Sequence, residues 1–372
     1  MHVCDAWMSR TSGTPHHLDA CRVSRIASCA ILTTGGRPAA IPLSSWMSRS
    51  RSRGCDGHSP LVWMQEGTHM PAHHLRWIEI TTLASGLPLR LAEHTFSGGQ
   101  PGPSVGITAA IHGDELAPVE ALRQLAARLQ SAELRGTVRI VPVVNPLSFQ
   151  AQTRNTPQDM TNLNRVFPGD RNGWLSEQLA ATFVAEFLPG LDALLDLHAG
   201  GALPTVDYAY IENDPDLSAA FGTKVLYRGP GFPGTFSHVA VSRGIRTVVT
   251  ELGGGLLRDR EYIARTVAGL ENALRHLGVL PGEVTRRTDQ IVIEQLDTLR
   301  PNQGGLLVPG VGVDQLGEVV EQGTLLGTVY NPQTFEMLQE LHAPHPRNLM
   351  ILTRGAATRV EAGDYGYMLA PV

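Results

Sequence analysis

The strongest constraint on the fold is a series of apolar strands that alternate with amphipathic helices between residues 104 and 277. Short β-branched apolar runs indicate buried strands, and apolar residues spaced three and four apart indicate helices. We expect strands at 104–111, 137–144, 192–197, 224–227 and 246–250. We expect helices at 116–129, 176–188, 235–243 and 258–277. This alternation predicts an α/β domain with a largely parallel sheet flanked by helices.

The composition divides the 372 residues into three parts. Residues 1–69 lack a sustained strand or helix period, so we expect a disordered N-terminal extension or a translation start assigned too early. Residues 70–284 hold the α/β pattern, and residues 285–372 change to short apolar runs between glycines. All four cysteines lie in the first 55 residues, so disulfides do not hold the main fold together.

Residues 285–372 predict a small all-β domain. Two of its segments, 320–327 and 360–366, resemble each other in sequence, which suggests two hairpins in quasi-symmetric positions. Such a pattern is similar to that of lipoyl- and biotinyl-type domains, which carry a cofactor on a lysine. Lys224 is the only lysine of the chain and lies outside this domain, so we exclude cofactor carriage.

Two histidines and a glutamate lie where predicted strands end. His112 follows the strand at 104–111 and precedes Glu115 by three residues, and His198 follows the strand at 192–197. A His-x-x-Glu match is common by chance, but open α/β sheets place their sites at the carboxyl ends of strands. Two histidines and a glutamate are a known ligand set for catalytic zinc. We therefore expect these three residues to bind one zinc ion per chain.

Glu251 follows the strand at 246–250 and precedes a glycine run, so it is expected at the same edge of the sheet. A carboxylate beside zinc-activated water can accept a proton and deliver it again. The alternative interpretation is a helix-capping or surface glutamate. Asp196 lies two residues before His198 on the same strand, where it could orient that ligand or only occupy the sheet edge.

A long loop between the two ligand segments contains Arg154 and the neighbouring pair Asn164 and Arg165. Guanidinium and amide groups suit the capture of a substrate carboxylate, and an arginine can also polarise a scissile carbonyl oxygen. Surface arginines are common in this lysine-poor chain, and the position of the loop is what favours a functional role.

Four ordered segments together resemble one enzyme family. They are HGDE at 112–115, TR at 153–154 with NLNRVFPGD at 162–170, DLHAGG at 196–201 and TELGGG at 250–255. This set is similar to the succinylglutamate desuccinylase/aspartoacylase family, a branch of the zinc carboxypeptidase superfamily. The resemblance covers about residues 75–372, including the β-rich end of the chain.

The resemblance implies a zinc-carboxypeptidase-like mixed sheet and a role for each candidate residue. The implied roles are zinc binding by His112, Glu115 and His198, general base and acid catalysis by Glu251, oxyanion stabilisation by Arg154, and substrate carboxylate binding by Asn164 with Arg165. Asp114 stands where many relatives carry asparagine, and we expect it to affect the loop more than the chemistry. Tyr208, Tyr210 and Arg246 are weaker candidates for specificity residues of the family type.

We therefore predict a zinc-dependent hydrolase that removes an acyl group from a small N-acyl amino acid or amine. A metallocarboxypeptidase acting on peptides would use the same atoms, with Arg165 on the peptide C-terminus, and a non-catalytic metal-binding relative is a further alternative.

The net charge of −5 argues against a general nucleic-acid binder. No apolar run approaches the ~20 residues of a membrane span. We expect a cytoplasmic protein, with a homo-oligomer as one possible state.

Overall fold

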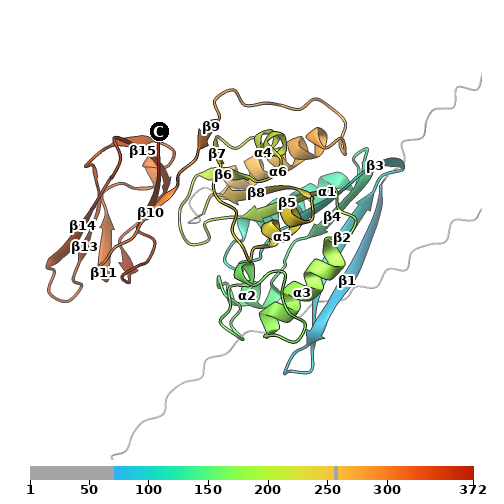
Figure 1. Cartoon of the computed structure of the whole chain (residues 1–372), viewed down its shortest axis with the longest axis horizontal. Coiled ribbons are helices and arrows are strands. Elements are labelled where there is room, and N and C mark those ends of the chain that lie inside the picture. Colours follow the sequence, from blue (N-terminus) through green and yellow to red (C-terminus); the bar gives the residue numbers. More distant parts are fainter. Residues whose placement is uncertain (1–70, 255–258) are drawn as a thin grey trace, which may run out of the picture. The chain divides into compact units, whose positions relative to one another are not determined.

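The computed structural model describes residues 71–254 and 259–372, and its largest element is a nine-stranded sheet (Figure 1). The strands follow the order β1-β2-β4-β3-β5-β8-β6-β7-β9. Their bounds are β1 (Ala72–Thr82), β2 (Pro88–Ser97), β3 (Gln100–Thr108), β4 (Arg135–Val141), β5 (Ala193–His198), β6 (Asp207–Ile211), β7 (Val225–Tyr227), β8 (Arg246–Leu252) and β9 (Ile291–Ile293). The pairs β4–β3, β3–β5, β5–β8, β6–β7 and β7–β9 are parallel and the other three are antiparallel. The expected mixed, largely parallel sheet is confirmed.

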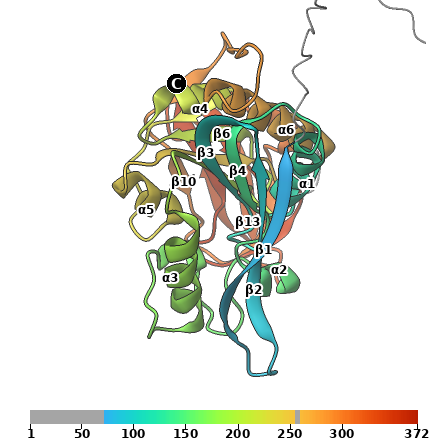
Figure 2. The same cartoon turned by 90° about the vertical axis from the view of Figure 1, so that its right-hand side faces the viewer.

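Helices cover both faces of this sheet. Their bounds are α1 (Ala117–Leu129), α2 (Pro146–Ala151), α3 (Leu175–Phe187), α4 (Pro215–Phe221), α5 (Phe236–Ser242) and α6 (Asp259–His276), with a 3-10 turn η1 (Leu163–Arg165). Successive residues of a strand point to opposite faces, and β5 shows this directly. Leu195 packs in the core under α1 and α6, whereas Leu194 packs in the core under α3 and α5. Figure 2 shows these two pairs of helices on opposite faces of the sheet. Among the described residues, no helix is long and apolar enough to cross a membrane.

The helix that contributes to the site, α5, has the ends that its sequence predicts. The Thr235 hydroxyl accepts a hydrogen bond from the backbone N–H of His238 at 3.2 Å, which caps the first turn. Gly244 follows the last turn with a φ of 77°, a conformation that suits glycine. The observed helix therefore lies within the predicted range 235–243.

Several elements were not predicted from the sequence. The hairpin of β1 and β2 begins at Ala72, and β1 is mostly exposed along its length, so its sequence shows little alternation. Helices α2 and α4 have six and seven residues, which is too short for a helical period to be recognised. Strand β6 has the sequence DYAYI, which is too short and too polar to form a recognisable apolar run.

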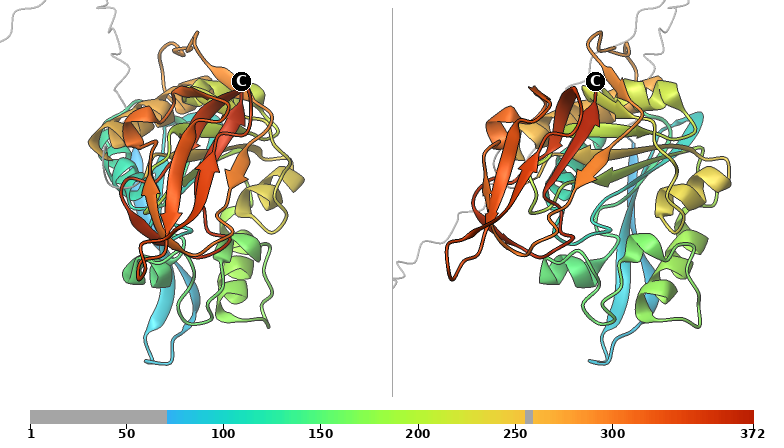
Figure 3. Two further views of the ribbon diagram at one scale, coloured as in Figure 1. Left: turned by 90° about the vertical axis from the view of Figure 1, so that its left-hand side faces the viewer. Right: turned by 60° about the vertical axis from the view of Figure 1, so that its left-hand side comes forward.

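The C-terminal domain consists of two four-stranded antiparallel sheets around their own apolar core (Figure 3). One sheet has the order β10-β17-β15-β12 and the other has the order β14-β13-β11-β16. The bounds are β10 (Asp297–Leu299), β11 (Gly305–Pro309), β12 (Val319–Glu321), β13 (Leu325–Tyr330), β14 (Met337–His342), β15 (Arg347–Leu352), β16 (Thr358–Val360) and β17 (Tyr367–Pro371), with a 3-10 turn η2 (Val313–Gln315). The expected small all-β domain is present.

The two similar segments of this domain are equivalent, but they are not hairpins. Gly323 and Gly363 both have a positive φ, 79° and 89°, in equivalent turns. The first turn joins β12 to β13 and the second joins β16 to β17, and in both cases the two strands belong to different sheets. The repeated sequence therefore encodes a crossover between sheets. A turn signal alone cannot distinguish this from a hairpin, because strand pairing depends on the rest of the domain.

The last strand of the large sheet lies beyond residue 284, where the sequence placed the domain boundary. Strand β9 pairs in parallel with β7, and its Ile293 is buried. The C-terminal domain also shares a core with the sheet, in which Ile351 packs with Val206 and Tyr208. The Val206 N–H donates to the Ile351 carbonyl at 2.9 Å. Residues 1–69, the predicted N-terminal extension, lie outside the described residues.

Candidate active site

The carboxyl ends of β3, β5 and β8 bring the candidate residues together. These strands are neighbours in the sheet, and His198 at the end of β5 is directly opposite Glu251 on β8. The segment after β3 carries His112 and Glu115 to the same edge. Gly113 makes this path possible, because a Cβ there would lie 1.9 Å from the Ser148 carbonyl carbon. The arrangement expected from the strand ends is therefore present.

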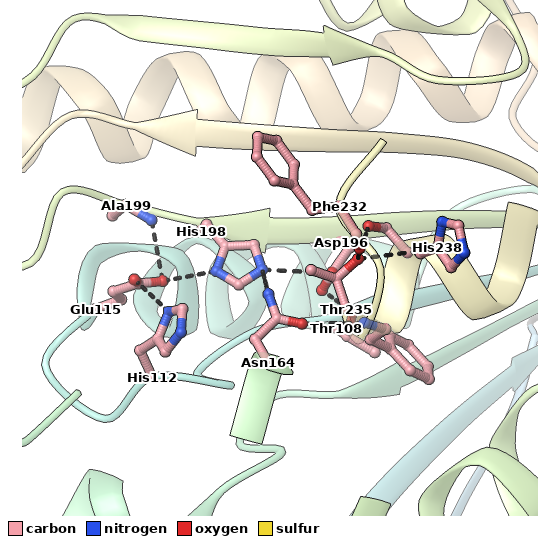
Figure 4. Close-up of polar contacts among 12 residues, drawn as sticks. Thr108, His112, Glu115, Asn164, Asp196, His198, Ala199, Phe232, Thr235 and His238 are labelled. Carbon is pink, nitrogen blue, oxygen red and sulfur yellow. Dashed lines mark hydrogen bonds and ion pairs between the residues drawn. The ribbon is translucent and has the colours of Figure 1, made fainter. Parts of the chain in front are cut away.

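His112, Glu115 and His198 form a compact buried group (Figure 4). Their ligand atoms all lie within 4.8 Å of one another. The Nδ1 atom of His112 is 2.7 Å from Glu115 Oε1, and the Nδ1 atom of His198 is 3.0 Å from Glu115 Oε2. Both imidazoles therefore direct the same nitrogen to one carboxylate. Two nitrogens and a carboxylate converging on one point are a donor set that suits zinc.

The other nitrogen of each imidazole faces an oxygen. His198 Nε2 is 3.4 Å from Asp196 Oδ2, and the second oxygen of Asp196 accepts a hydrogen bond from the Thr108 hydroxyl at 2.7 Å. His112 Nε2 is 3.1 Å from Asn162 Oδ1. At His112 the oxygen acceptor favours the tautomer that leaves the Nδ1 lone pair free for a metal, whereas His198 Nε2 faces both the Asp196 carboxylate and the Asn164 amide nitrogen. The contact made by Asp196 fits an orienting role better than a passive place at the sheet edge.

The electrostatics of this group favour cations. Burial alone would lower the pKa of His198, but the carboxylates of Asp196 and Glu115 raise it well above its ordinary value. Burial would raise the pKa of Glu115, but the two histidines outweigh it and hold that pKa below its usual range. A buried carboxylate that stays ionised beside a second carboxylate supplies the negative charge that a divalent cation needs.

Glu251 lies beside this group, with its side chain half-buried. Burial and the nearby Glu115 carboxylate raise the pKa of Glu251 to about 7. A carboxyl group with such a pKa can exchange a proton near neutral pH. On the other side of β8, Tyr208 of β6 is opposite Glu251, and its hydroxyl is 3.4 Å from that of Tyr210. Burial raises the pKa of both tyrosines, so they stay protonated at neutral pH.

Arg154 also reaches the group. Its Nη1 is 3.3 Å from His112 Nδ1 and 3.5 Å from Glu115 Oε1, and half of its side chain is exposed. The guanidinium is thus next to the donor atoms and still open to solvent. Arg246, a weak candidate in the sequence, lies elsewhere: it is exposed and pairs with Asp214. Arg246 is the first residue of β8 and therefore lies at the opposite end of that strand from Glu251.

Asn164 and Arg165 lie on η1, beside His198. The amide nitrogen of Asn164 is 3.4 Å from His198 Nε2, and its oxygen accepts the Phe236 N–H at 3.0 Å. The Asn164 amide therefore connects a metal-ligand candidate to the first residue of α5. The guanidinium of Arg165 is exposed and donates to the Asn164 carbonyl at 2.7 Å. Of the pair, Arg165 has the donors that remain open to a ligand.

Asn162 and Thr108 were not among the predicted site residues, and Asp114 was expected to affect the loop. Asn162 lies in the segment 162–170 that carries the family resemblance, but no local pattern indicates its contact with His112 or that of Thr108 with Asp196, because these contacts join segments that are distant in sequence. Asp114 lies against Gly201, where a Cβ would be 2.6 Å from its Oδ2. Its Oδ1 is buried without a hydrogen-bond partner among the described residues. In the described part of the chain, His112, Glu115 and His198 are the one group of three that could hold a metal.

The fold and the site define an α/β protein with a buried two-histidine, one-glutamate group of the kind that binds a metal ion. Residues 101–277 match the model of the succinylglutamate desuccinylase/aspartoacylase catalytic domain. The chain is 33% identical over 287 residues to an N-alpha-acetyl-L-2,4-diaminobutyric acid deacetylase of Halomonas elongata, covering 73% of this chain and 83% of that protein. The chain belongs to the succinylglutamate desuccinylase/aspartoacylase family.

Solved structures of relatives have the same fold. The product-bound ectoine utilization protein EutE (DoeB) of Ruegeria pomeroyi superposes with a TM-score of 0.72 at 27% identity, over 81% of this chain and 95% of that one. An aspartoacylase family protein of Mesorhizobium loti superposes with a TM-score of 0.70 at 28% identity, over 82% of this chain and 96% of that one. Both superpositions extend well beyond the catalytic-domain match, which ends at residue 277.

Proposed function

We propose that the protein is a zinc-dependent hydrolase that removes an acyl group from a small N-acyl amino acid or amine. The observation that carries this proposal is the convergence of both Nδ1 atoms on the Glu115 carboxylate, beside Glu251. Relatives named as deacylases support hydrolysis of an amide. The proposal goes beyond this family membership in assigning the metal, the residues and their roles.

His112, Glu115 and His198 would hold the zinc ion. These residues fit a zinc ion because the two imidazoles and the carboxylate are buried and converge on one point. The remaining nitrogen of each imidazole has an oxygen nearby. When bound, zinc acidifies water and polarises a carbonyl oxygen. Asp196 would fix the His198 ring, since it contacts His198 Nε2 and is itself held by Thr108.

Glu251 would serve as the general base and then as the general acid. It would take a proton from the attacking water and deliver it to the leaving amine, because its raised pKa lets it hold a proton in one step and release it in the next. Arg154 would stabilise the negative oxygen that develops on the substrate carbonyl, since its guanidinium is next to the ligand atoms and half-exposed.

Asn164 and Arg165 would hold a carboxylate of the substrate. In this arrangement the exposed Arg165 guanidinium makes the direct contact, since the Asn164 amide already contacts His198 and Phe236. Asn164 would then act mainly by placing Arg165 relative to His198. A small N-acyl amino acid supplies both the amide and the carboxylate that this geometry needs.

A metallocarboxypeptidase acting on peptides is the second candidate, because it would use the same metal group and the same arginine. The named function of the Halomonas elongata relative, deacetylation of N-alpha-acetyl-L-2,4-diaminobutyric acid, favours the deacylase. That compound belongs in the first panel of substrates. A cytoplasmic location, action without nucleic-acid or membrane partners, and a homo-oligomeric state stay predictions from the sequence.

A substrate panel tests the proposal. Acetyl, succinyl and formyl derivatives of acidic and basic amino acids are compared with short peptides, with and without a metal chelator. We expect hydrolysis of at least one N-acyl amino acid, loss of activity with the chelator and recovery with added zinc. Faster cleavage of peptides would favour the carboxypeptidase. Failure to hydrolyse any amide in a zinc-loaded sample would contradict both candidates and leave the non-catalytic relative.

A further inference from the structure

The two sheets of the C-terminal domain have different surroundings (Figure 3). The sheet with β15 and β17 contributes Leu349, Ile351 and Ala370 to the core that this domain shares with the catalytic domain. The buried apolar residues of the other sheet, β14-β13-β11-β16, belong to the core between the two sheets. In a two-sheet sandwich, the face of such a sheet that points away from this core normally carries polar side chains.

The outer face of the sheet β14-β13-β11-β16 is instead largely apolar. Leu307 and Val329 point into the core, so their neighbours along β11 and β13 point outward. Strand pairing places Leu306, Tyr330 and Met337 side by side in one row across β11, β13 and β14. The apolar side chains that define this outer face are Leu306 (36% exposed), Val308 (38%), Met337 (56%) and the partly exposed Tyr330.

The turn between β13 and β14 adds an exposed aromatic ring at the end of this row. Phe335 lies two residues before Met337, and its side chain is 82% exposed. Its φ is 62°, a conformation that a bulky residue rarely adopts. The Phe335 N–H donates to the Asn331 carbonyl at 2.9 Å, which helps to hold the turn in this form. An unfavourable backbone conformation that presents a phenyl ring to solvent is typical of a binding surface.

Apolar side chains in this arrangement indicate a protein partner. Soluble monomers rarely expose contiguous apolar patches, and aromatic and methionine side chains are enriched where proteins bind each other. The opposite side of the sandwich already packs on the catalytic domain through Ile351 and its neighbours. A partner on the outer face would therefore cover the second side of the domain.

Two charged residues on the same face identify this partner as a second copy of the chain. Glu340 of the edge strand β14 is opposite Thr328, and Arg359 of the edge strand β16 is opposite Leu306. The face therefore has a negative group at one edge and a positive group at the other. A two-fold axis parallel to the strands places the β14 edge of one copy over the β16 edge of the other, so these opposite charges meet twice. Their pairs within the chain are exposed and of the kind that contributes little.

We propose that two copies of this chain form a dimer through the outer faces of their C-terminal domains. The two sheets pack face to face, with the row of Leu306, Tyr330 and Met337 at the centre. Packed sheets lie about 10 Å apart, a distance at which such side chains interdigitate. Glu340 of each copy pairs with Arg359 of the other. The proposal is independent of the deacylase function, and it gives a surface to the homo-oligomer expected from the sequence.

Sedimentation of the full chain over a range of concentrations tests the apolar part of this interface. We expect a dimer for the wild type and a Kd raised by about 100-fold or more in Leu306→Glu and in Phe335→Glu. The reason is that each substitution occurs twice in a two-fold interface and places a charge among apolar groups. Leu87→Glu is the matched control, because Leu87 is an apolar residue with 64% exposure in the β1–β2 turn. This variant should dimerise like the wild type.

Charge reversal tests the two-fold arrangement itself. Glu340→Arg and Arg359→Glu should each raise the dimer Kd by about 10-fold, because like charges then face each other. The double variant should recover most of the wild-type affinity, since both contacts form again with inverted signs. A lack of recovery would reject the proposed pairing of the two edges.

Two results of the sedimentation experiment would overturn the proposal. A wild-type chain that stays monomeric at about 100 µM would show that a different molecule, or none, covers this face. A dimer that persists unchanged in Leu306→Glu and Phe335→Glu would have its interface elsewhere. If Leu306→Glu fails to fold, Phe335→Glu carries the same comparison, because its ring lies in an exposed turn. Since folding and dimerisation are linked, the unfolding of all variants is compared below the dimer Kd.

Discussion

At the scale of single residues, the site depends on which atom each side chain presents. The two imidazoles direct Nδ1 to Glu115 and Nε2 to Asp196 or Asn162, so each ring has one nitrogen for a metal and one for an oxygen acceptor. Glu251 is close to this group but separate from it, and its surroundings favour the protonated form. These differences support the proposed roles, in which Glu115 binds the metal and Glu251 transfers the proton.

Replacement of Glu251 by glutamine tests this division. We expect kcat to fall by about 10²- to 10⁴-fold, because the amide cannot accept a proton. Zinc content should stay near that of the wild type, since Glu251 is outside the group of three. Initial rates and metal analysis measure the two quantities, with Glu271→Gln on α6 as a control that retains activity. A fully active Glu251→Gln enzyme would contradict the assignment.

The pH dependence of kcat/KM should show an acid limb that belongs to Glu251. The base acts when ionised, so the rate falls as the pH falls through its pKa. Burial and Glu115 raise that pKa to about 7, and a bound cation lowers it again, so we expect the midpoint of the limb below pH 7. Rates between about pH 5 and pH 9 locate the midpoint. A rate that rises toward acid pH would argue against a general base.

At the scale of secondary-structure elements, the parallel strands place the candidate residues at one edge of the sheet, and flanking elements fix their side chains. Strand β5 contributes both His198 and the fully buried Asp196, two residues apart and therefore on one face of the sheet. Helix α5 holds the other side of the group, because its Phe236 N–H binds the Asn164 amide that contacts His198. The site thus rests on β5, η1 and α5 together.

Replacement of Asp196 by asparagine should weaken metal binding. The neutral amide interacts less with the His198 imidazole, and such outer contacts are typically worth 10- to 100-fold in metal affinity. Competition with a chelator of known affinity measures the change. Asp192→Asn is the control, because the Asp192 side chain precedes β5 and accepts a hydrogen bond from the Ser104 N–H, away from the two histidines. Unchanged affinity in Asp196→Asn would show that this contact does not orient the ligand.

Replacement of Phe236 by alanine should destabilise the α3–α5 side of the sheet. Phe236 is fully buried and packs against Phe183 with ring centroids 4.8 Å apart. Removal of such a ring costs about 3–5 kcal/mol in the free energy of unfolding. Urea denaturation measures the loss, and Phe335→Ala is the control because that ring is 82% exposed. Equal stability of the two variants would contradict the packing seen here.

At the scale of the whole molecule, the described chain has two domains that share a small core. Ile351 of β15 packs with Val206 and Tyr208 of the catalytic domain, and backbone hydrogen bonds join the same segments. Tyr208 is also opposite Glu251. A change in the C-terminal domain can therefore affect the catalytic edge through this shared core, which gives that domain more than a passive role.

Replacement of Ile351 by alanine tests the coupling between the domains. The side chain is fully buried, so the substitution should cost about 2–5 kcal/mol in the free energy of unfolding. Because the core is shared, we expect one thermal transition that moves to lower temperature as a whole. Calorimetry measures it, with the exposed Val308→Ala as control. Two separate transitions, only one of them shifted, would show that the domains unfold independently.

The α/β class, the small β domain and the positions of the candidate ligands could be predicted from the amino-acid sequence. Local patterns are sufficient for these, because strand and helix periods are short-range and parallel strands place their carboxyl ends at one edge. It also placed His112, Glu115, His198 and Glu251 at strand ends, where the structure brings them together. Their roles stay proposals until the variants above are measured.

The partners of these residues and the pairing of the C-terminal strands follow from the folded chain and could not be read from local patterns. Thr108 meets Asp196 and Asn162 meets His112 across long stretches of chain, and no local pattern encodes such contacts. The repeated turns around Gly323 and Gly363 became crossovers between sheets, because strand pairing is chosen by the packing of the whole domain. The segments 202–204 and 354–358 line one cavity for the same reason, because only the folded chain brings them together.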